Sequence, residues 1–357
     1  MNEKRYQAII SGAERSVTAS LARGGLTVAS LGYRSVVAAR NLMFDLGLRR
    51  SHDLGRPAIS IGNLTAGGTG KTPMVIEVAC RLLNMGKRPA VLLRGYHAQD
   101  GLSDEARLLA DALAPHVMVH AHPKRRIGAA NALLANSNID CFILDDAFQH
   151  RQAQRQLDIV LIDATNPFGH GRVLPRGLLR ESPYGLRRAQ CAVVTRADLV
   201  APEMLDALLK QLAHLTDGQV KLSQVAFEWK GYRGPDDRTI DLQDLHDQCV
   251  LGVCGVGNPQ AFTKMLTRQL GQQRVLTMDD HYAYTADDLT SIFKQAEEIG
   301  AKAIITTEKD WVKWRLHVPA GGWPLPVYRP VLGVHWLAGE EIFEAMLQQF
   351  DHDTPEA

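Results

Sequence analysis

The sequence predicts an α/β fold, in which a parallel β-sheet carries helices on both faces and a smaller C-terminal α/β domain follows. Four short apolar runs alternate with stretches of helical periodicity; the first leads into a glycine-rich loop and the other three into a polar or acidic residue. The runs are Ala58–Ile61, Cys141–Leu144, Ile159–Ile162 and Ala192–Val194. With 357 residues, the chain is also long enough for two domains with cores of their own.

Composition excludes several classes of protein. Lys plus Arg number 40 and Asp plus Glu 39, and a net charge of +1 argues against a dedicated nucleic-acid binder. Ordinary glycine and proline content excludes collagen-like and low-complexity chains. The five cysteines form no Cys-x-x-Cys pair, so we expect buried thiols in a reducing compartment. No uncharged apolar run reaches the ~18 residues of a membrane-spanning helix.

Residues 1–56 differ from the rest of the chain. They hold nine basic and four acidic residues, a net charge of +5, in a stretch that reads as helical. Apolar residues recur between the arginines, as in a basic amphipathic helix: Leu31, Val36, Val37, Leu42, Met43, Leu46 and Leu48. Two interpretations stay open, a helix packed on the domain with a solvated outer face and a surface helix resting on an anionic membrane.

A glycine-rich loop follows the first apolar run and precedes a helix-like segment. A strand, a glycine loop, Lys-Thr and a helix form the layout of a P-loop, whose backbone N–H groups hold phosphate. Lys71 is suited to the β and γ phosphates of ATP, and Thr72 to Mg²⁺. The strict pattern has glycine where Thr65 stands, and the alternative is a loop that caps a helix without nucleotide. The expected nucleotide-binding residues are Gly67, Gly68, Thr69, Gly70, Lys71 and Thr72.

Acidic and polar residues end the later runs. Asp145 and Asp146 follow the second run, as in a Walker B strand whose carboxylate holds the metal ion of the nucleotide; a plain helix cap is the alternative. Arg180 and Glu181 lie in a long charged loop and are suited to clamp phosphate and metal, unless the loop is ordinary surface. The segment 195–198, Thr-Arg-Ala-Asp, is similar to a guanine-reading sequence, which keeps a G-protein-like regulatory NTPase open as the rival function.

These signals divide the chain into four expected parts. They are a basic amphipathic helical segment facing a membrane (1–56), a P-loop kinase core (57–219), a smaller C-terminal α/β domain (220–350) and a tail (351–357). The core ends with a helix over 202–215. In the smaller domain we expect strands at 250–254 and 303–307, a helix from Pro259, a strand-like segment over 327–337 and a last helix over 340–350.

Eight motifs in order resemble the tetraacyldisaccharide 4'-kinases, the lipid A 4'-kinase family of Gram-negative-type bacteria, over about residues 30–345. They are Gly62-Asn63 with the glycine loop, Arg94-Gly95-Tyr96, Ser103-Asp104-Glu105, Asp145–His150, Leu174–Gly177 with Arg180-Glu181, Cys254–Pro259, Asp280-His281 and Thr306–Asp310. The family has glycine where Ala147 stands, so we expect Ala147 to occupy an ordinary backbone region.

The resemblance implies ATP-dependent phosphorylation of the 4'-hydroxyl of a tetraacyldisaccharide 1-phosphate, which gives lipid IVA in a late step of lipid A biosynthesis. It implies Mg²⁺ as the metal and a peripheral place on the cytoplasmic face of the inner membrane, and we expect a monomer. By matching position, Asp104 is the catalytic base and His281 its partner; on its own, His281 reads as a surface histidine. Asp145, Asp146 and Glu181 form an acidic cluster on the metal side. Arg180 and Arg125, or Arg126 in its place, contact anions. A small-molecule kinase and a membrane-bound scaffold remain weaker alternatives.

Overall fold

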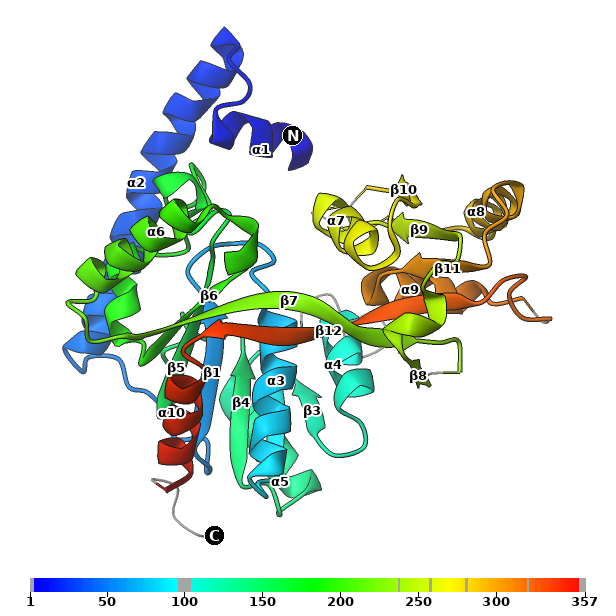
Figure 1. Ribbon diagram of the computed structural model, residues 1–357. Coiled ribbons are helices and arrows are strands. Elements are labelled where there is room, and N and C mark those ends of the chain that lie inside the picture. The colour runs from blue at the N-terminus through cyan, green and yellow to red at the C-terminus, as the bar shows by residue number, and fades with distance from the viewer. Residues whose placement is uncertain are drawn as a thin grey trace. The chain divides into compact units, whose positions relative to one another are not determined.

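The computed structural model describes residues 3–95, 104–236, 238–256, 259–279, 282–319 and 321–352, without the side chains of residues 3, 4, 104, 351 and 352. Contacts divide the chain into two compact units. Unit 1 comprises Met1–Ala226 with His335–Ala357, and unit 2 comprises Phe227–Val334. Two strands, β7 (Lys221–Arg233) and β12 (Val327–Ala338), run from one unit into the other (Figure 1).

The sheet of unit 1 is parallel and has the order β7-β6-β5-β1-β4-β2-β3. Its strands, besides β7, are β1 (Ala58–Asn63), β2 (Pro89–Leu93), β3 (Met118–Ala121), β4 (Cys141–Asp145), β5 (Leu157–Asp163) and β6 (Cys191–Thr195). All four predicted strands are therefore present. Strand β1 lies between β4 and β5, so the carboxyl ends of these three strands meet at one edge of the sheet.

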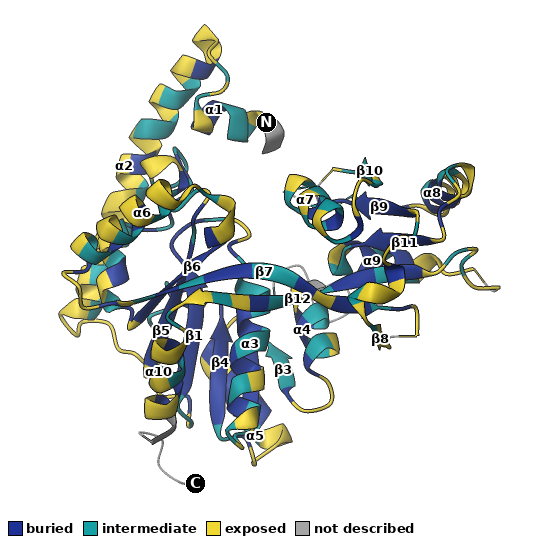
Figure 2. Cartoon of the chain, in the orientation of Figure 1, coloured by how far each residue is buried: buried dark blue, intermediate teal, exposed yellow. Residues whose placement is uncertain are grey.

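Helices cover both faces of this sheet, as predicted. Alternate strand residues point to opposite faces, and one face packs against α5 (Arg125–Ala135) and α6 (Pro202–Leu215). Figure 1 shows α3 (Lys71–Asn84) and α10 (Glu340–His352) in front of the sheet. Figure 2 shows that β1, β2, β4, β5 and β6 are buried almost along their whole length, whereas the edge strand β3 is half-buried. Helix α4 (Asp104–Leu113) contacts α3 and β3.

The N-terminal segment forms two helices, α1 (Glu3–Ser11) and α2 (Val17–Asp45). Ser16 caps α2, because its side chain accepts a hydrogen bond from the amide of Ala19 at 3.1 Å. Arg23 of α2 donates to the carbonyl of Ile9 in α1 at 3.4 Å and to that of Glu14, between the two helices, at 2.7 Å. Most of the outer face of α2 is exposed (Figure 2). In the described part of the chain, we find no helix with the length and apolar character needed to cross a bilayer.

Unit 2 is a smaller α/β unit. Strand β9 (Val250–Cys254) pairs in parallel with β10 (Arg274–Thr277) and β11 (Ala303–Thr306), and β11 pairs with β12. Helix α7 (Pro259–Leu270) packs on one face, and α8 (Ala286–Glu298) with α9 (Glu308–Trp314) packs on the other. The short strand β8 (Thr239–Ile240) pairs with β7.

The end of the chain returns to unit 1, whereas the expected smaller domain ran to residue 350. Arg81 on α3 explains the difference, because its guanidinium bonds Glu77 at 2.7 Å, pairs with Glu340 and Glu344 of α10, and lies 5.1 Å above the ring of Trp336. These contacts secure the end of β12 and α10 against the helix that begins at the P-loop.

The thiols follow the prediction only in part. Cys141, Cys191 and Cys254 are buried in β4, β6 and β9, as expected. Cys80 and Cys249 are exposed, so the expectation of burial is wrong for these two. Cys80 lies on the solvent side of α3, and Cys249 directly precedes β9. Apolar residues beside a cysteine in the sequence therefore did not predict whether its thiol points into the core or toward solvent.

Candidate active site

The glycine-rich loop connects β1 to α3 at the carboxyl edge of the sheet. Gly67 and Gly70 have φ angles of 127° and 91°, a region that glycine adopts without strain, and Gly70 directly precedes α3. Thr65 is not among the residues of positive φ and instead bridges to Leu179 in antiparallel fashion. The departure from the strict pattern at Thr65 is thus explained, since this position needs extended backbone.

Lys71, the first residue of α3, points toward polar groups at the ends of β1 and β4. Its Nζ lies 3.4 Å from Asn63 Oδ1 and 3.5 Å from Asp146 Oδ1. Asn63 is buried, and its Nδ2 donates to the carbonyl of Thr65 at 2.7 Å. The structure therefore brings together the loop, the lysine and one predicted acid, as the P-loop pattern requires.

The two adjacent acids have different environments. Asp145 is 5% exposed, and its Oδ1 has no hydrogen-bond partner among the described residues. Burial raises the pKa of Asp145 to about 7, although Lys71 lowers it. For Asp146, burial is the largest influence and alone would raise the pKa, yet Lys71 and Arg180 together hold it below the ordinary value. Asp146 is thus an ionised partner of two cations.

Asp146 also has a strained backbone. Its φ of 51° lies in the left-handed region, which non-glycine residues seldom occupy. Arg180 Nη1 donates to both carboxylate oxygens of Asp146, at 2.8 and 2.9 Å. Ala147, the next residue, is absent from the residues of positive φ, which confirms the expectation of an ordinary backbone there.

Glu181 is not in a cluster with the two aspartates. Its side chain is 1% exposed, and Arg188 Nη2 donates to both of its oxygens at 2.9 and 2.8 Å. Asn41 and Gln149 each donate to it at 3.0 Å. We find no group of three acidic, histidine or cysteine side chains able to hold a metal ion within the described ranges. Glu181 is thus occupied by Arg188, Asn41 and Gln149, and metal binding by Asp145, Asp146 and Glu181 together stays a prediction.

Arg125 is the first residue of α5, and its side chain contacts the end of β4. It is 3% exposed, and its Nη2 donates to the carbonyl of Asp145 at 2.6 Å. Arg126 is exposed. Arg125 thus supports the strand end that presents Asp145, and its contact with a substrate anion stays a prediction.

The catalytic pair lies partly outside the described part of the chain. Asp104 is the first residue of α4, in unit 1, and its side chain is not described. His281, of unit 2, lies outside the described residues. The pairing of Asp104 with His281 therefore stays a prediction.

Two residues that hold the P-loop were missed as such by sequence reasoning. Thr195 Oγ1 donates to the carbonyl of Thr69 at 3.0 Å, and Arg196 Nη2 donates to the carbonyl of Gly68 at 2.8 Å. Arg196 also pairs with Asp163 at the end of β5. Thr195 and Arg196 belong to segment 195–198, whose sequence suggested guanine recognition. In the structure, both side chains instead support the glycine-rich loop. The sequence signal that could have indicated this role is the polar residue at the end of each of two strands, Asp163 of β5 and Thr195 of β6, which are the strands on one side of β1 in the sheet.

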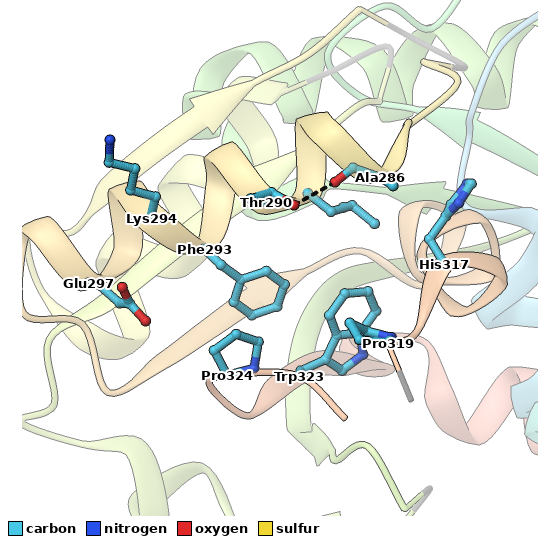
Figure 3. A pocket seen from close by; sticks show the side chains of 10 residues that line it. Ala286, Thr290, Phe293, Lys294, Glu297, His317, Pro319, Trp323 and Pro324 are labelled. Atoms are coloured by element: carbon cyan, nitrogen blue, oxygen red, sulfur yellow. Dashed lines mark hydrogen bonds between the residues drawn. The ribbon is translucent and has the colours of Figure 1, made fainter. Parts of the chain in front are cut away.

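A pocket in unit 2 has a different character. It has a volume of about 280 Å³ and is lined by α8 together with His317, Pro319, Trp323 and Pro324. Figure 3 shows Phe293, Trp323 and Pro324 gathered at its centre, with Lys294 and Glu297 pointing away. The rings of Phe293 and Trp323 stack at 5.0 Å. The pocket offers an apolar wall, and none of the predicted site residues lines it.

Comparison with known proteins identifies the family of the chain. A family model described as Tetraacyldisaccharide-1-P 4'-kinase matches residues 22–347. The Tetraacyldisaccharide 4'-kinase of Anaeromyxobacter dehalogenans (strain 2CP-C) is 36% identical over 348 residues, which are 92% of this chain and 90% of that one. That of Halothermothrix orenii is 32% identical over 86% of each chain. A crystal structure of LpxK from Aquifex aeolicus in complex with ATP superposes with a TM-score of 0.72 and 26% identity over 92% of this chain and 99% of that one. The chain belongs to the tetraacyldisaccharide-1-P 4'-kinase family.

Proposed function

We propose that this protein transfers the γ-phosphate of ATP to the 4'-hydroxyl of a tetraacyldisaccharide 1-phosphate. The juxtaposition of the glycine loop, Lys71 and the strand-end acids at one sheet edge carries the proposal, together with the family. Phosphoryl transfer needs little covalent work from a protein, and most of the catalysis lies in positioning and charge neutralisation. Lys71 supplies a cation at the transferring phosphate, and the loop amides hold the remaining phosphate oxygens.

Mg²⁺ fits this site. The buried Asp145 Oδ1, without a partner among the described residues, lies next to the acid that Lys71 pairs with. Thr72 is the second residue of α3, where P-loop proteins place the hydroxyl that binds the metal. Thr72 and Asp145 would hold the ion, and it would neutralise charge on the phosphates. Since Mg²⁺ usually takes one or two carboxylates with water and phosphate, a three-acid cage is unnecessary.

Arg180 and Asp146 act as a pair in this proposal. Arg180 is fixed on Asp146 by two hydrogen bonds, so its guanidinium is already ordered beside Lys71. Such pre-organisation lowers the cost of stabilising charge in the transition state. We further propose that Asp104 accepts the proton of the sugar hydroxyl and that His281 orients or polarises it.

We also propose that the protein acts as a monomer at the cytoplasmic face of the inner membrane, with α2 lying on the lipid. Large apolar side chains on α2 are exposed, including Val17 (78%), Leu21 (74%) and Val28 (71%). Arg34 is exposed on α2, Arg15 is exposed just before the helix begins, and both would attract anionic headgroups.

An assay with labelled ATP and a tetraacylated disaccharide 1-phosphate in detergent micelles tests the function. We expect a labelled bis-phosphorylated product that depends on Mg²⁺. Nucleotide hydrolysis with a preference for GTP and no labelled lipid would favour a G-protein-like NTPase instead. A labelled product from a small sugar without acyl chains would point to a small-molecule kinase.

A further inference from the structure

We propose that α2 positions the active site from within: polar side chains on its inner face, chiefly Tyr33 and Asn41, hold the 172–181 loop so that Arg180 and Glu181 meet the P-loop. The proposal rests on the proposed kinase function and deepens it. It assigns to the helix a role in the chemical step, beyond any role in membrane binding.

The inner face of α2 makes a row of hydrogen bonds to this loop. Tyr33 Oη donates to the carbonyl of Arg180 at 2.9 Å, and Asn41 Nδ2 donates to Glu181 Oε2 at 3.0 Å. Ser30 Oγ donates to the carbonyl of Val173 at 2.8 Å and accepts from the amide of Arg176 at 2.9 Å. At 100° per residue, positions 30, 33 and 41 fall within one side of the helix.

The exposed apolar residues lie on the other side of the same helix. Val17, Leu21 and Val28 are all more than half exposed, and their helical angles are opposite to those of the polar row. The helix therefore has two separate faces, one facing solvent and the other bonded to the loop. Substitutions on one face leave the contacts of the other in place, so the two roles are separable by experiment.

Helix α1 contacts the same loop. Tyr6 Oη donates to the carbonyl of Pro175 at 2.8 Å, and Arg176 Nη1 donates to the carbonyl of Ile10 at 2.8 Å. Six hydrogen bonds with the two N-terminal helices thus fall on five loop residues, at positions 173, 175, 176, 180 and 181.

On its far side, the loop is bonded to the P-loop segment. The amide of Arg180 donates to the carbonyl of Leu64 at 2.7 Å, and the amide of Ala66 donates to the carbonyl of Leu178 at 2.7 Å. Gln149 Nε2 joins Glu181 to the carbonyl of Asn63, at 3.0 and 2.9 Å. Arg180 is consequently held at its carbonyl by α2, at its amide by the P-loop segment and at its guanidinium by Asp146.

The consequence is that a small loss on α2 reaches the reacting phosphate. Without the Tyr33 hydroxyl, the carbonyl of Arg180 loses its α2 anchor, and the guanidinium is less well ordered over Asp146. Catalytic groups need placement within fractions of an ångström, and poor support from neighbouring residues lowers the rate of the chemical step. Tyr33 and Asn41 are therefore positioning residues.

The test compares Tyr33→Phe and Asn41→Asp with Asn41→Gln and the control Ser35→Ala in the micelle assay. Tyr33→Phe removes one hydrogen bond, and we expect kcat to fall about fivefold, the equivalent of a typical net hydrogen bond. Asn41→Asp is isosteric but sets a second carboxylate against Glu181, and we expect a fall of about thirtyfold or more. Asn41→Gln keeps the donor and should recover most of the rate. Among the described residues, the exposed Ser35 side chain bonds only the carbonyl of Leu31 in its own helix, so Ser35→Ala should match the wild type.

Two further readouts separate positioning from folding and from membrane binding. The KM for ATP and the binding to anionic vesicles should stay within twofold of the wild type. Hydrogen exchange of the Leu178 and Arg180 amides should become faster in Tyr33→Phe, with other protected amides unchanged. Wild-type kcat and wild-type exchange in both Tyr33→Phe and Asn41→Asp would overturn the proposal. Wild-type protein that makes no lipid product would instead contradict the proposed function, and the exchange measurement would still decide whether α2 holds the loop.

Discussion

The two units each place a glycine-containing turn between a parallel strand and a helix, and they use it in opposite ways. In unit 1, the turn after β1 leads into Lys71, which pairs with Asp146 at 3.5 Å, and Asp145 at the end of β4 has a buried carboxylate oxygen with no partner among the described residues. In unit 2, the turn after β9 faces an acid of its own protein: the amide of Gly255 donates to Asp310 Oδ2 at 2.9 Å. An amide already bonded to an internal carboxylate is not available to a phosphate.

Asp310 is the centre of a closed network. It is fully buried, and it also accepts from Tyr284 Oη at 3.1 Å and Thr307 Oγ1 at 2.6 Å. A Cβ at Gly255 would come within 2.9 Å of Asp310 Oδ1. The similar strand, turn and helix order therefore builds a ligand site in one unit and a structural joint in the other. The difference lies in the acid beside each turn, which is Asp145 at the end of β4 in unit 1 and Asp310 in α9 in unit 2.

Removing the cation of the open site should have the largest effect. We expect Lys71→Ala to lower kcat by about a thousandfold, because a fixed charge at the transferring phosphate is lost. Single-turnover kinetics with labelled ATP measure this loss. Lys210→Ala, on the solvent side of α6, is the matched control, and normal turnover by Lys71→Ala would contradict the P-loop assignment.

Removing the metal-side acid should have the next largest effect. Asp145→Asn should raise the Mg²⁺ concentration for half-maximal rate by about a hundredfold, since the amide is a much poorer ligand. Glu181→Gln should leave that concentration close to the wild-type value, whatever its effect on kcat, because Glu181 is enclosed by Arg188, Asn41 and Gln149. A Mg²⁺ titration of the rate distinguishes the two. An equal shift in both variants would support the three-acid cluster.

In the closed network, Asp310→Ala should reduce stability and spare nucleotide binding. It leaves three donors without their acceptor, and we expect the free energy of unfolding of unit 2 to fall by about 2–3 kcal/mol. Urea unfolding followed by tryptophan fluorescence reports this unit, which holds four of the five tryptophans. The exposed Asp287→Asn is the control. ATP binding lost in parallel with unit 2 stability would show that the two turns are not independent.

The support under the open turn predicts a smaller change. Arg196→Met removes the donor to the carbonyl of Gly68, and we expect the KM for ATP to rise about tenfold with a lesser change in kcat. The exposed Arg187→Met serves as control. A KM for ATP equal to that of the wild type would mean that the loop holds its shape without this arginine.

The smallest effect concerns the membrane face of α2, which contributes to neither turn. Leu21→Ser with Val28→Ser should weaken binding to anionic vesicles about tenfold, because both side chains are largely exposed and available to lipid. Leu134→Ser, 87% exposed on α5, is the matched control. Arg15→Gln with Arg34→Gln should weaken binding a few-fold at low salt only. Unchanged sedimentation with vesicles would leave α2 with its inner-face role alone.

The sequence by itself determined the strands, the P-loop and the family. Buried parallel strands must be apolar along their length, so the runs ending at Ile61, Leu144 and Ile162 were visible without any contact information. Glycines with Lys71 and Thr72 were equally visible, since phosphate binding demands those residue types in consecutive positions. The expected helix over 202–215 and the strand over 250–254 have the observed bounds.

Only the tertiary structure decided which polar groups meet. Glu181 was expected beside Asp145 and Asp146, yet Asn41 of α2 and Arg188 enclose it, and no local pattern joins positions 41, 181 and 188. In the same way, Arg196 was ambiguous until the order β6-β5-β1 brought it to Gly68. Backbone periodicity is a local property, whereas hydrogen-bond partners depend on how distant segments pack.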